Sequence, residues 1–444
     1  MIVTRFSPSP TGHIHVGNVR VALVNYLFTQ KLGGKFILRI DDTDLIRSEE
    51  KFFEQIIKDL EWLGITWDEM FKQSSRLQYY EDMKNQLIAT NIIYPCFETE
   101  EELSIQRKIQ LSRGVPPIYD RSSLKLTKDE ISSKLDKGEK PYYRFLLDDY
   151  EVSWEDGIRG NISFKSRTFS DPVVIRENGS PTYTFCSVLD DSEYNITDII
   201  RGEDHISNTA VQIKMLRSIG SKIPNFHHLS LLKTKQGGMS KRLGGFDIMS
   251  LRKNGIDAMA INSLLSRLGT SDNVEPVRSL SDLVKDFSMN KFSAGAINYN
   301  ENDVFKLNRK IISQKTYQEI LPYLDNLGIV NITEDFWESI KDNIVSYHDI
   351  QDWYEIFNTD FQPDITDEDK EFLKIAAEIL PNEVTVGNFS AWITEITKTT
   401  GRKGKDLYHP LRVALTNKTA GPELSKIVPL LGPGKVKQRL LGST

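Results

Sequence analysis

The N-terminal residues change character in a fixed order: apolar, loop-forming, amphipathic and apolar again. Residues 2–6 are a short, β-prone apolar run, which predicts a buried strand. Residues 7–12 contain two prolines and a glycine, which exclude a helix or a strand ladder and predict a stiff loop. From Asn18 onward apolar residues recur at helical spacing, Gly33-Gly34 ends that helix, and residues 35–40 form a second apolar run. We therefore predict a strand–loop–helix–strand unit of a parallel sheet.

The predicted loop lies at the carboxyl end of a strand, which is where open parallel sheets bind ligands. The N–H groups at the start of the following helix would be free to bind phosphate. Gly17 has no side chain to keep a nucleotide away, and His13 and His15 stand beside it. Either histidine alone would pass for an ordinary surface residue. Their place in this loop is what predicts a nucleotide site.

Helices and short strands are predicted to alternate up to about residue 250. Helices are expected over residues 48–63, with Ser48 as the N-cap, and over residues 75–88. Strands are expected over residues 142–147, 162–164 and 229–232. After Ser250 no strand pattern persists, and the helical pattern is interrupted at Pro276, Pro322, Pro363 and Pro381.

Composition places the chain among ordinary globular proteins. With 444 residues, 39% hydrophobic and 27% charged, we expect two to four domains. Neither a leader-like N-terminus nor an apolar run of membrane-spanning length is apparent, so a cytoplasmic protein without membrane contact is the expectation. Cys96 and Cys186 are the only cysteines, which excludes a disulfide framework and a four-cysteine zinc site.

The net charge of −6 argues against indiscriminate nucleic-acid binding, but the charges are unevenly spread. Acidic residues dominate between Thr333 and Lys370. Basic residues dominate near the C-terminus, at Lys398, Arg402, Lys403, Lys405, Arg412, Lys418, Lys426, Lys435, Lys437 and Arg439. Such a patch could contact a phosphate backbone, and from charge alone a solvated helical face is equally consistent.

Specific motifs run nearly end to end. Arg5, residues 7–12 (Ser-Pro-Ser-Pro-Thr-Gly) and residues 15–18 (His-Val-Gly-Asn) closely resemble the nucleotide-binding segment of class I aminoacyl-tRNA synthetases, the glutamyl-tRNA synthetases in particular. Later segments resemble the same family in the same order, over residues 117–121, 143–145, 171–176, 181–183, 188–191, 199–205, 208–210 and 238–242. The last of these resembles the family's second motif, a mobile loop with the pattern Lys-Leu-Ser-Lys-Arg.

The resemblance implies an α/β chain: a Rossmann-type catalytic domain split by an α+β insertion, then all-helical tRNA-binding domains. Residues 1–95 and 172–248 would form the two halves of the catalytic domain. Residues 96–171 would be the insertion that binds the tRNA acceptor end. Residues 249–315 would contact the tRNA stem, and residues 316–444 would bind the anticodon.

The resemblance further implies ligation of L-glutamate to tRNA(Glu) through a glutamyl adenylate, using ATP with Mg²⁺, by a monomeric enzyme. It leaves open whether tRNA(Gln) is charged as well. His15 and Lys241 would be the catalytic residues. Glutamate would be bound by Arg5, Ser7, Asp41, Tyr183, Ser187 and Arg201. ATP would be bound by Ser9, Thr11, Gly12, His15, Gly17, Asn18, Asp204, Met239, Ser240 and Lys241.

Three positions depart from the family pattern. Relatives often carry Glu where this chain has Asp41 and Asn where it has Ser187, and Gly238 replaces the first lysine of the second motif. Some relatives bind a zinc ion through cysteines just after the position of Cys96. Because Cys96 has no cysteine nearby, neither structural zinc nor another bound metal is expected.

Other functions fit the motifs less well. A glutaminyl enzyme is disfavoured by Pro-Ser-Pro-Thr-Gly, and a paralogue that glutamylates a modified tRNA base is disfavoured by the long helical C-terminal half. A tRNA-binding or regulatory protein without catalysis is supported only by Gly238. Pyrophosphate release with ATP, glutamate and tRNA would separate these alternatives.

Overall fold

The structure is a computed structural model that describes residues 1–44, 46–234, 247–363 and 365–442. It divides into two compact units, which are described separately. Unit 1 comprises Met1–Ser250, Asn262–Glu275 and Ser279–Asn300, and unit 2 comprises Leu251–Ile261, Pro276–Arg278 and Glu301–Thr444.

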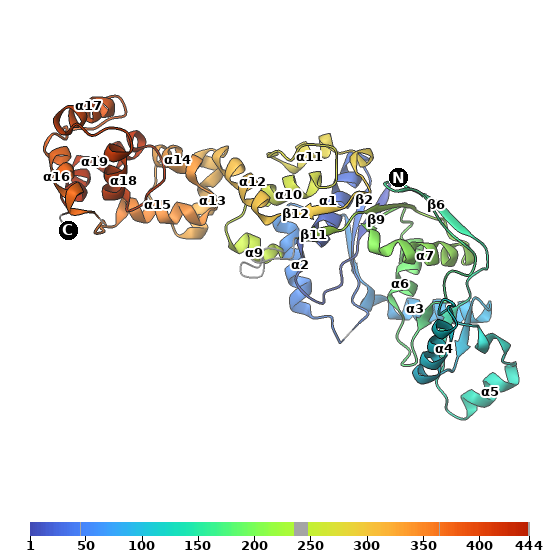
Figure 1. The fold of residues 1–444 in the computed structure, drawn as a ribbon. Coiled ribbons are helices and arrows are strands. Elements are labelled where there is room, and N and C mark those ends of the chain that lie inside the picture. The colour runs from blue at the N-terminus through green and yellow to red at the C-terminus, as the bar shows by residue number, and fades with distance from the viewer. Residues whose placement is uncertain (45, 235–246, 364, 443–444) are drawn as a thin grey trace. The chain divides into compact units, whose positions relative to one another are not determined.

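A parallel sheet forms the centre of unit 1 (Figure 1). The predicted strands appear as β1 (Val3–Phe6) and β2 (Lys35–Ile40), which pair in parallel, and β2 also pairs with β3 (Glu69–Lys72). A second group has the order β7-β6-β10-β9, in which β10 is parallel to both β6 and β9. These strands are β6 (Val152–Asp156), β7 (Gly160–Phe164), β9 (Asp198–Gly202) and β10 (Asn225–Leu229). The two groups meet where the Thr197 N–H donates to the Val3 carbonyl (2.9 Å), so β9 lies beside β1.

The helices of this sheet come from the crossovers between its strands. They are α1 (Val16–Lys31), α2 (Glu50–Trp62), α3 (Leu77–Ala89), α6 (Tyr183–Glu193) and α7 (Ile206–Ser218). The helix predicted to be capped by Ser48 is α2, and that cap is wrong. Its N-cap is Glu49, and the buried Ser48 hydroxyl has no hydrogen-bond partner.

The predicted α+β insertion is confirmed between the catalytic segments. Here β4 (Ile93–Cys96), β5 (Tyr142–Phe145) and β8 (Val173–Ile175) form an antiparallel sheet, joined by α4 (Glu100–Ser112) and α5 (Lys128–Asp136). The β6–β7 hairpin from the same stretch instead extends the central sheet.

The expectation that strands end before Ser250 is wrong. Residues 229–232 were predicted as one strand, but Leu229 ends β10 and Leu232 begins β11 (Leu232–Thr234). β11 pairs in parallel with β12 (Ile297–Tyr299), a run too short to show a periodic pattern. The remaining helices of this stretch are α9 (Ile248–Lys253), α10 (Ala258–Arg267) and α11 (Leu280–Asp286).

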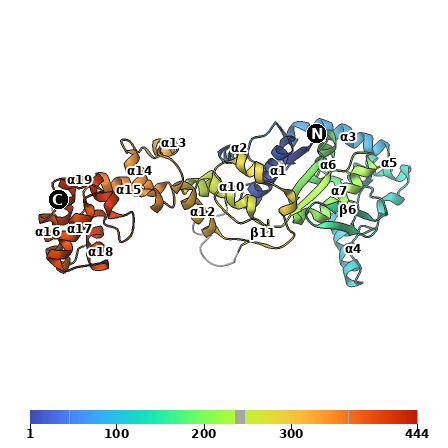
Figure 2. The same ribbon diagram turned by 90° about the horizontal axis from the view of Figure 1, so that it is seen from above.

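The described residues of unit 2 form helices joined by loops, with no strand among them. Its helices are α12 (Glu301–Ser313), α13 (Tyr317–Leu327), α14 (Glu334–Ile340), α15 (His348–Asn358), α16 (Asp367–Glu378), α17 (Phe389–Thr400), α18 (Lys405–Thr416) and α19 (Leu424–Leu441). Helices α16 to α19 form one group around a shared apolar core that includes Leu373, Trp392 and Leu411 (Figures 1 and 2). Pro322 does not interrupt the pattern, because it lies inside α13.

Short 3₁₀ turns connect several elements, at Gln73–Arg76, Ser122–Lys125, Glu203–His205, Met289–Lys291 and Lys341–Asn343. Among the residues that the structure describes, no helix is both long enough and apolar enough to cross a bilayer.

Candidate active site

A cavity of about 1030 Å³ opens in unit 1 where β1, β9 and β10 end. This is the edge that parallel-sheet geometry predicts for a ligand. The cavity brings together the predicted residues Arg5, Ser7, Ser9, Thr11, Gly12, His15, Gly17, Asn18, Tyr183, Arg201 and Asp204. Asp41 and Ser187 do not line it. Gly238, Met239, Ser240 and Lys241 lie outside the described residues.

His15 occupies the N-cap of α1. Its Nδ1 accepts the Gly17 N–H (3.0 Å), while its own N–H donates to Asn18 Oδ1 (3.2 Å). The Gly17 N–H, which we expected to be free for phosphate, is therefore engaged. Burial lowers the pKa of His15, so the ring is neutral near pH 7. With Nδ1 accepting, the proton sits on Nε2, which leaves His15 with a donor to offer a ligand.

Arg201 is a buried cation without a carboxylate at hydrogen-bonding distance. It is the last residue but one of β9, and its Nη2 donates to Thr209 Oγ1 (2.5 Å) and Gln212 Oε1 (2.6 Å). Its Nε and Nη1 are buried and have no hydrogen-bond partner. Burial lowers the pKa of Arg201 from its ordinary value, as expected for a charge moved out of water, but a guanidinium still keeps its proton.

Ser7 offers a second unsatisfied group. Its hydroxyl is buried in the cavity wall and has no hydrogen-bond partner. Buried polar groups normally find partners, and the exceptions call for an explanation such as a ligand. Ser7 and Arg201 thus line the same cavity, and each has buried polar atoms without a hydrogen-bond partner.

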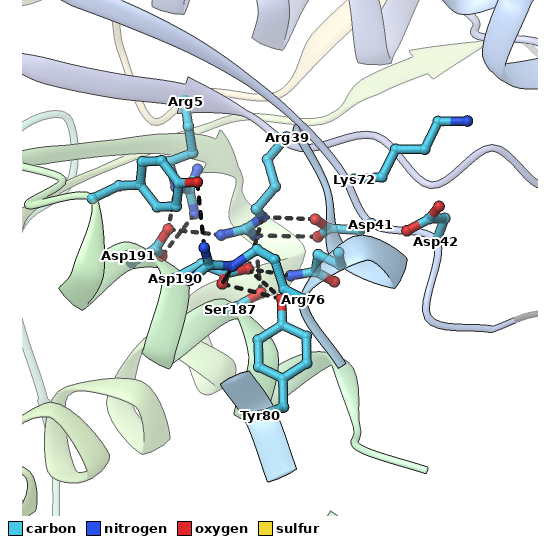
Figure 3. Close-up of polar contacts among 12 residues, drawn as sticks. Arg5, Arg39, Asp41, Asp42, Lys72, Arg76, Tyr80, Ser187, Asp190 and Asp191 are labelled. Carbon is cyan, nitrogen blue, oxygen red and sulfur yellow. Dashed lines mark hydrogen bonds and ion pairs between the residues drawn. The ribbon is translucent and has the colours of Figure 1, made fainter. Parts of the chain in front are cut away.

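Arg5 differs from Arg201 because it belongs to a cluster of buried ion pairs (Figure 3). Arg5 Nε donates to Asp191 Oδ1 (3.1 Å), and Arg39 Nη1 donates to the same oxygen (2.9 Å). Although burial raises the pKa of a carboxyl, the two guanidinium groups hold the pKa of Asp191 below its ordinary value. We call Arg5, Arg39, Arg76, Asp41, Asp190 and Asp191 the arginine–aspartate cluster.

Asp41 and Ser187 both belong to the surroundings of Arg39. Arg39 Nε and Nη2 donate to the two carboxylate oxygens of Asp41 (2.7 and 3.2 Å), and Nη2 also donates to Ser187 Oγ (3.0 Å). Asp41 has 6% of its surface exposed and Ser187 none. Both side chains therefore accept hydrogen bonds from Arg39, and neither lines the cavity.

The sequence did not point to Arg39, Arg76 or Asp190 as parts of the site. Asp190 accepts from Arg76 Nε (3.0 Å) and from the Tyr80 hydroxyl (2.9 Å). One signal was available: Arg39 interrupts an apolar strand two residues before Asp41, and a charge inside a buried strand requires a partner.

Arg20 was also missed. It lines the cavity from α1 and donates to the carbonyls of Ser230 (2.8 Å) and Leu268 (3.0 Å). Burial lowers its pKa to about 10, so it stays charged at neutral pH.

Within the described part of the chain, no three His, Cys, Asp or Glu side chains gather as metal ligands would. Cys96 is buried and lies near the Tyr119 hydroxyl (3.8 Å). The absence of zinc remains a prediction.

Two family models match the chain. Residues 1–306 match the catalytic domain of the class I tRNA synthetases (E and Q), and residues 315–442 match an anticodon binding domain. Together these matches confirm the predicted fold class.

Similar proteins cover the whole length. The chain is 46% identical over 441 residues to glutamate–tRNA ligase 1 of Rickettsia prowazekii (strain Madrid E), covering 99% of each chain. It is 47% identical over 443 residues to glutamate–tRNA ligase 2 of Orientia tsutsugamushi (strain Boryong), again covering 99% of each.

A solved glutamate tRNA ligase from Elizabethkingia meningosepticum, in complex with its amino acid, superposes with a TM-score of 0.86 at 26% identity, covering 99% of this chain and 98% of that one. Sequence, fold and site thus agree, and the chain belongs to the glutamate–tRNA ligases, a family of class I aminoacyl-tRNA synthetases.

Proposed function

We propose that the cavity of unit 1 holds L-glutamate and ATP side by side and joins them as glutamyl adenylate, which is then passed to tRNA(Glu). Class I membership implies the use of ATP. An oxygen of the α-carboxylate of glutamate attacks the α-phosphorus of ATP, and pyrophosphate leaves. A hydroxyl at the end of the tRNA then attacks the carbonyl carbon and AMP leaves. Both steps depend on placement and charge, without a nucleophilic side chain.

The observation that carries this proposal is that Arg201 is buried with no carboxylate at hydrogen-bonding distance. Its Nε and Nη1 are buried and have no hydrogen-bond partner, and Arg201 is one of the residues that line a cavity of substrate size. The side-chain carboxylate of glutamate would satisfy both the charge and the free N–H groups. Glutamine would leave the guanidinium without an anion, which should cost roughly 3–5 kcal/mol. Arg5 and Tyr183, which line the same cavity, would complete the pocket.

ATP would bind along the loop that follows β1 and the start of α1. His15 would donate its Nε2–H to the nucleotide, and Gly12 leaves room because no other atom lies within 4 Å of the position its Cβ would take. Lys241, with Met239 and Ser240, would reach the phosphates from the second motif. Mg²⁺ would arrive with ATP, held mainly by phosphate and water, in keeping with the lack of a metal cluster among the described residues.

The glutamate ammonium needs an anion, and Asp41 is the residue that the family pattern indicates. Both of its oxygens already accept from Arg39, so it would have to receive the ammonium with its remaining lone pairs. Ser187 would act only through Arg39, whose Nη2 it accepts.

Unit 2 would bind the tRNA with part of its C-terminal basic patch. Arg439 is not available, because it is buried and its Nη1 donates to the carbonyl of Leu415 (2.6 Å). Arg402 pairs with Asp369, and Lys435 donates to the carbonyl of Phe357. The exposed members are Lys398, Lys403, Lys405 and Lys437.

Arg201→Ala tests the pocket. We expect kcat/KM for glutamate to fall about 100-fold or more, since a lost charged partner costs roughly 3 kcal/mol. The KM for ATP should change little, and preference for glutamate over glutamine should shrink. Arg217→Ala is the matched control, because Arg217 is an exposed arginine on α7 outside the cavity. A folded Arg201→Ala enzyme with near-normal glutamate kinetics would show that the pocket is misassigned.

The tRNA surface is tested by the double variant Lys403→Glu and Lys405→Glu. We expect about 10-fold weaker tRNA(Glu) binding near 0.1 M salt and a shallower salt dependence, because two phosphate contacts become repulsive. Lys374→Glu, at an exposed lysine on α16, is the control. Equal tRNA affinity in all three proteins would place the tRNA elsewhere. Aminoacylation of separately purified tRNA(Glu) and tRNA(Gln) by the unmodified protein shows whether both are charged.

A further inference from the structure

We propose that His228, fixed by Asp156, positions Arg201 through Thr209, so that a buried Asp156–His228–Thr209 chain sets the guanidinium that recognises the glutamate side chain. This inference rests on the proposed role of Arg201. The residues come from separate elements: Asp156 from β6, Arg201 from β9, Thr209 from α7 and His228 from β10. Arg201 and His228 are directly opposite each other in the β9–β10 register.

The contacts form a continuous line. Asp156 Oδ2 lies 2.5 Å from His228 Nδ1, His228 Nε2 lies 2.9 Å from Thr209 Oγ1, and Thr209 Oγ1 accepts Arg201 Nη2–H at 2.5 Å. The side chains of Asp156 and His228 are fully buried, as is Thr209. With no water to compete, each partner fixes the next.

Chemistry gives the line a single direction. The Asp156 carboxylate can only accept, so His228 Nδ1 carries a proton. Burial lowers the pKa of His228, so the ring is neutral and Nε2 is bare. The single Thr209 hydroxyl proton has two acceptors within reach, the bare His228 Nε2 at 2.9 Å and the His205 carbonyl at 3.2 Å. The shorter contact directs the proton to Nε2 and leaves the oxygen lone pairs to accept from Arg201. Burial alone would raise the pKa of Asp156, but its hydrogen bond from His228 brings it to about 2, so the carboxylate is charged.

This arrangement solves a particular problem for Arg201. A carboxylate partner would hold the guanidinium equally well, but it would also neutralise the charge that the substrate needs. Thr209 and Gln212 are neutral acceptors that bind the same Nη2 and leave Nε and Nη1 free. Asp156 is the only carboxylate in this line of contacts, and His228 and Thr209 lie between it and Arg201.

The adjacent residue provides a matched control. His227 lies on the same strand, and its Nε2 is 3.2 Å from Asp198 Oδ1, so it is also a largely buried histidine paired with an aspartate. His227 does not line the cavity. Its side chain bonds to Asp198, which has no hydrogen bond to Arg201 among those of the described residues. Replacing His227 and His228 therefore perturbs the same sheet to a similar degree while only one change reaches the guanidinium.

The test measures KM for glutamate and for ATP separately, in aminoacylation of tRNA(Glu). Thr209→Val keeps the shape but removes the hydroxyl, and we expect the glutamate KM to rise about 10-fold with the ATP KM unchanged within about 2-fold. Thr209→Ser restores the hydroxyl and should return the glutamate KM to within about 3-fold of normal. His228→Gln should raise the glutamate KM by about 3- to 10-fold, and His227→Gln should leave it unchanged.

Several results would overturn the inference. These are a normal glutamate KM in folded Thr209→Val, an equal rise in the ATP KM, a Thr209→Ser variant as impaired as Thr209→Val, or equal effects of the two histidine changes. Circular dichroism and melting temperature establish that each variant is folded. Failure here is distinct from failure of the proposed function: if Arg201→Ala abolishes glutamate selection while Thr209→Val does not alter it, the pocket stands and only the positioning line is rejected.

Discussion

Two buried arginines in unit 1 are treated in opposite ways. Arg39, at the centre of the arginine–aspartate cluster, donates to Asp41 and Asp191 and has 1% of its surface exposed. Arg201, with 5% exposed, donates only to the neutral Thr209 and Gln212. Both residues end or nearly end a strand of the same sheet. They differ in whether a carboxylate of the protein is bonded directly to the guanidinium.

The difference separates structural from functional burial of charge. The cluster contains three arginines and three aspartates, so it is neutral as a whole and needs nothing from outside. Arg201 is buried beside the cavity and its hydrogen-bond acceptors are neutral, and a buried charge without a directly bonded anion costs folding free energy unless a ligand supplies one. An unmatched buried charge is therefore better evidence for a ligand than the number of charges in a region.

Replacing each arginine in turn tests this difference most directly. Arg39→Met leaves Asp41 and Asp191 with lost partners, and we expect unfolding free energy to fall by about 3–5 kcal/mol. Arg201→Met removes a charge that has no carboxylate bonded to it, so stability should change by less than about 1 kcal/mol while glutamate selection is lost. Urea unfolding of the full-length variants, followed by tryptophan fluorescence, measures the free energy of unfolding of each. Equal losses of stability would mean that the two sites are not different in kind.

A second prediction gives Arg201 the partner it lacks. Gln212→Glu places a carboxylate on Nη2, which should compete with the substrate and raise the glutamate KM about 30-fold, with stability kept or increased. Gln212→Met removes the acceptor without adding charge and should have a smaller effect. Steady-state kinetics with varied glutamate gives the values. A Gln212→Glu enzyme with normal glutamate KM would show that free charge on Arg201 is not required.

The smallest expected effect is on the reactivity of the cysteine thiols, and Cys186 reports whether water reaches the arginine–aspartate cluster. Cys186 lies one turn before Asp190 on α6 and is buried, and burial raises its thiol pKa. Burial also raises the pKa of Cys96 to about 11. Because the thiolate is the reactive form, the native protein should show negligible reaction with a thiol reagent at pH 8, against both thiols after unfolding. Fast labelling of the native enzyme would mean that water reaches the cluster.

The sequence was most informative where local rules decide the structure. Strand β2 has the predicted bounds, and α1 starts two residues before the predicted Asn18, because His15 caps it through a contact that periodicity does not reveal. β12 was missed because three residues, placed by pairing with a distant strand, carry no pattern. The family pattern brought most predicted residues to one cavity. It could not show that Asp41 and Ser187 turn toward Arg39, because that depends on which side chains share a buried space.

The β6–β7 hairpin limits how the insertion can be exchanged between relatives, whether by engineering or by domain shuffling in evolution. The stretch between the catalytic halves is not a detachable cassette, because β6 is a strand of the central sheet and brings Asp156 to His228. Excising residues 96–171 as a block would remove that carboxylate and open an edge of β10. A functional transplant between relatives would have to cut inside the stretch, exchanging β4 to β5 with α4 and α5 while leaving the hairpin with its host.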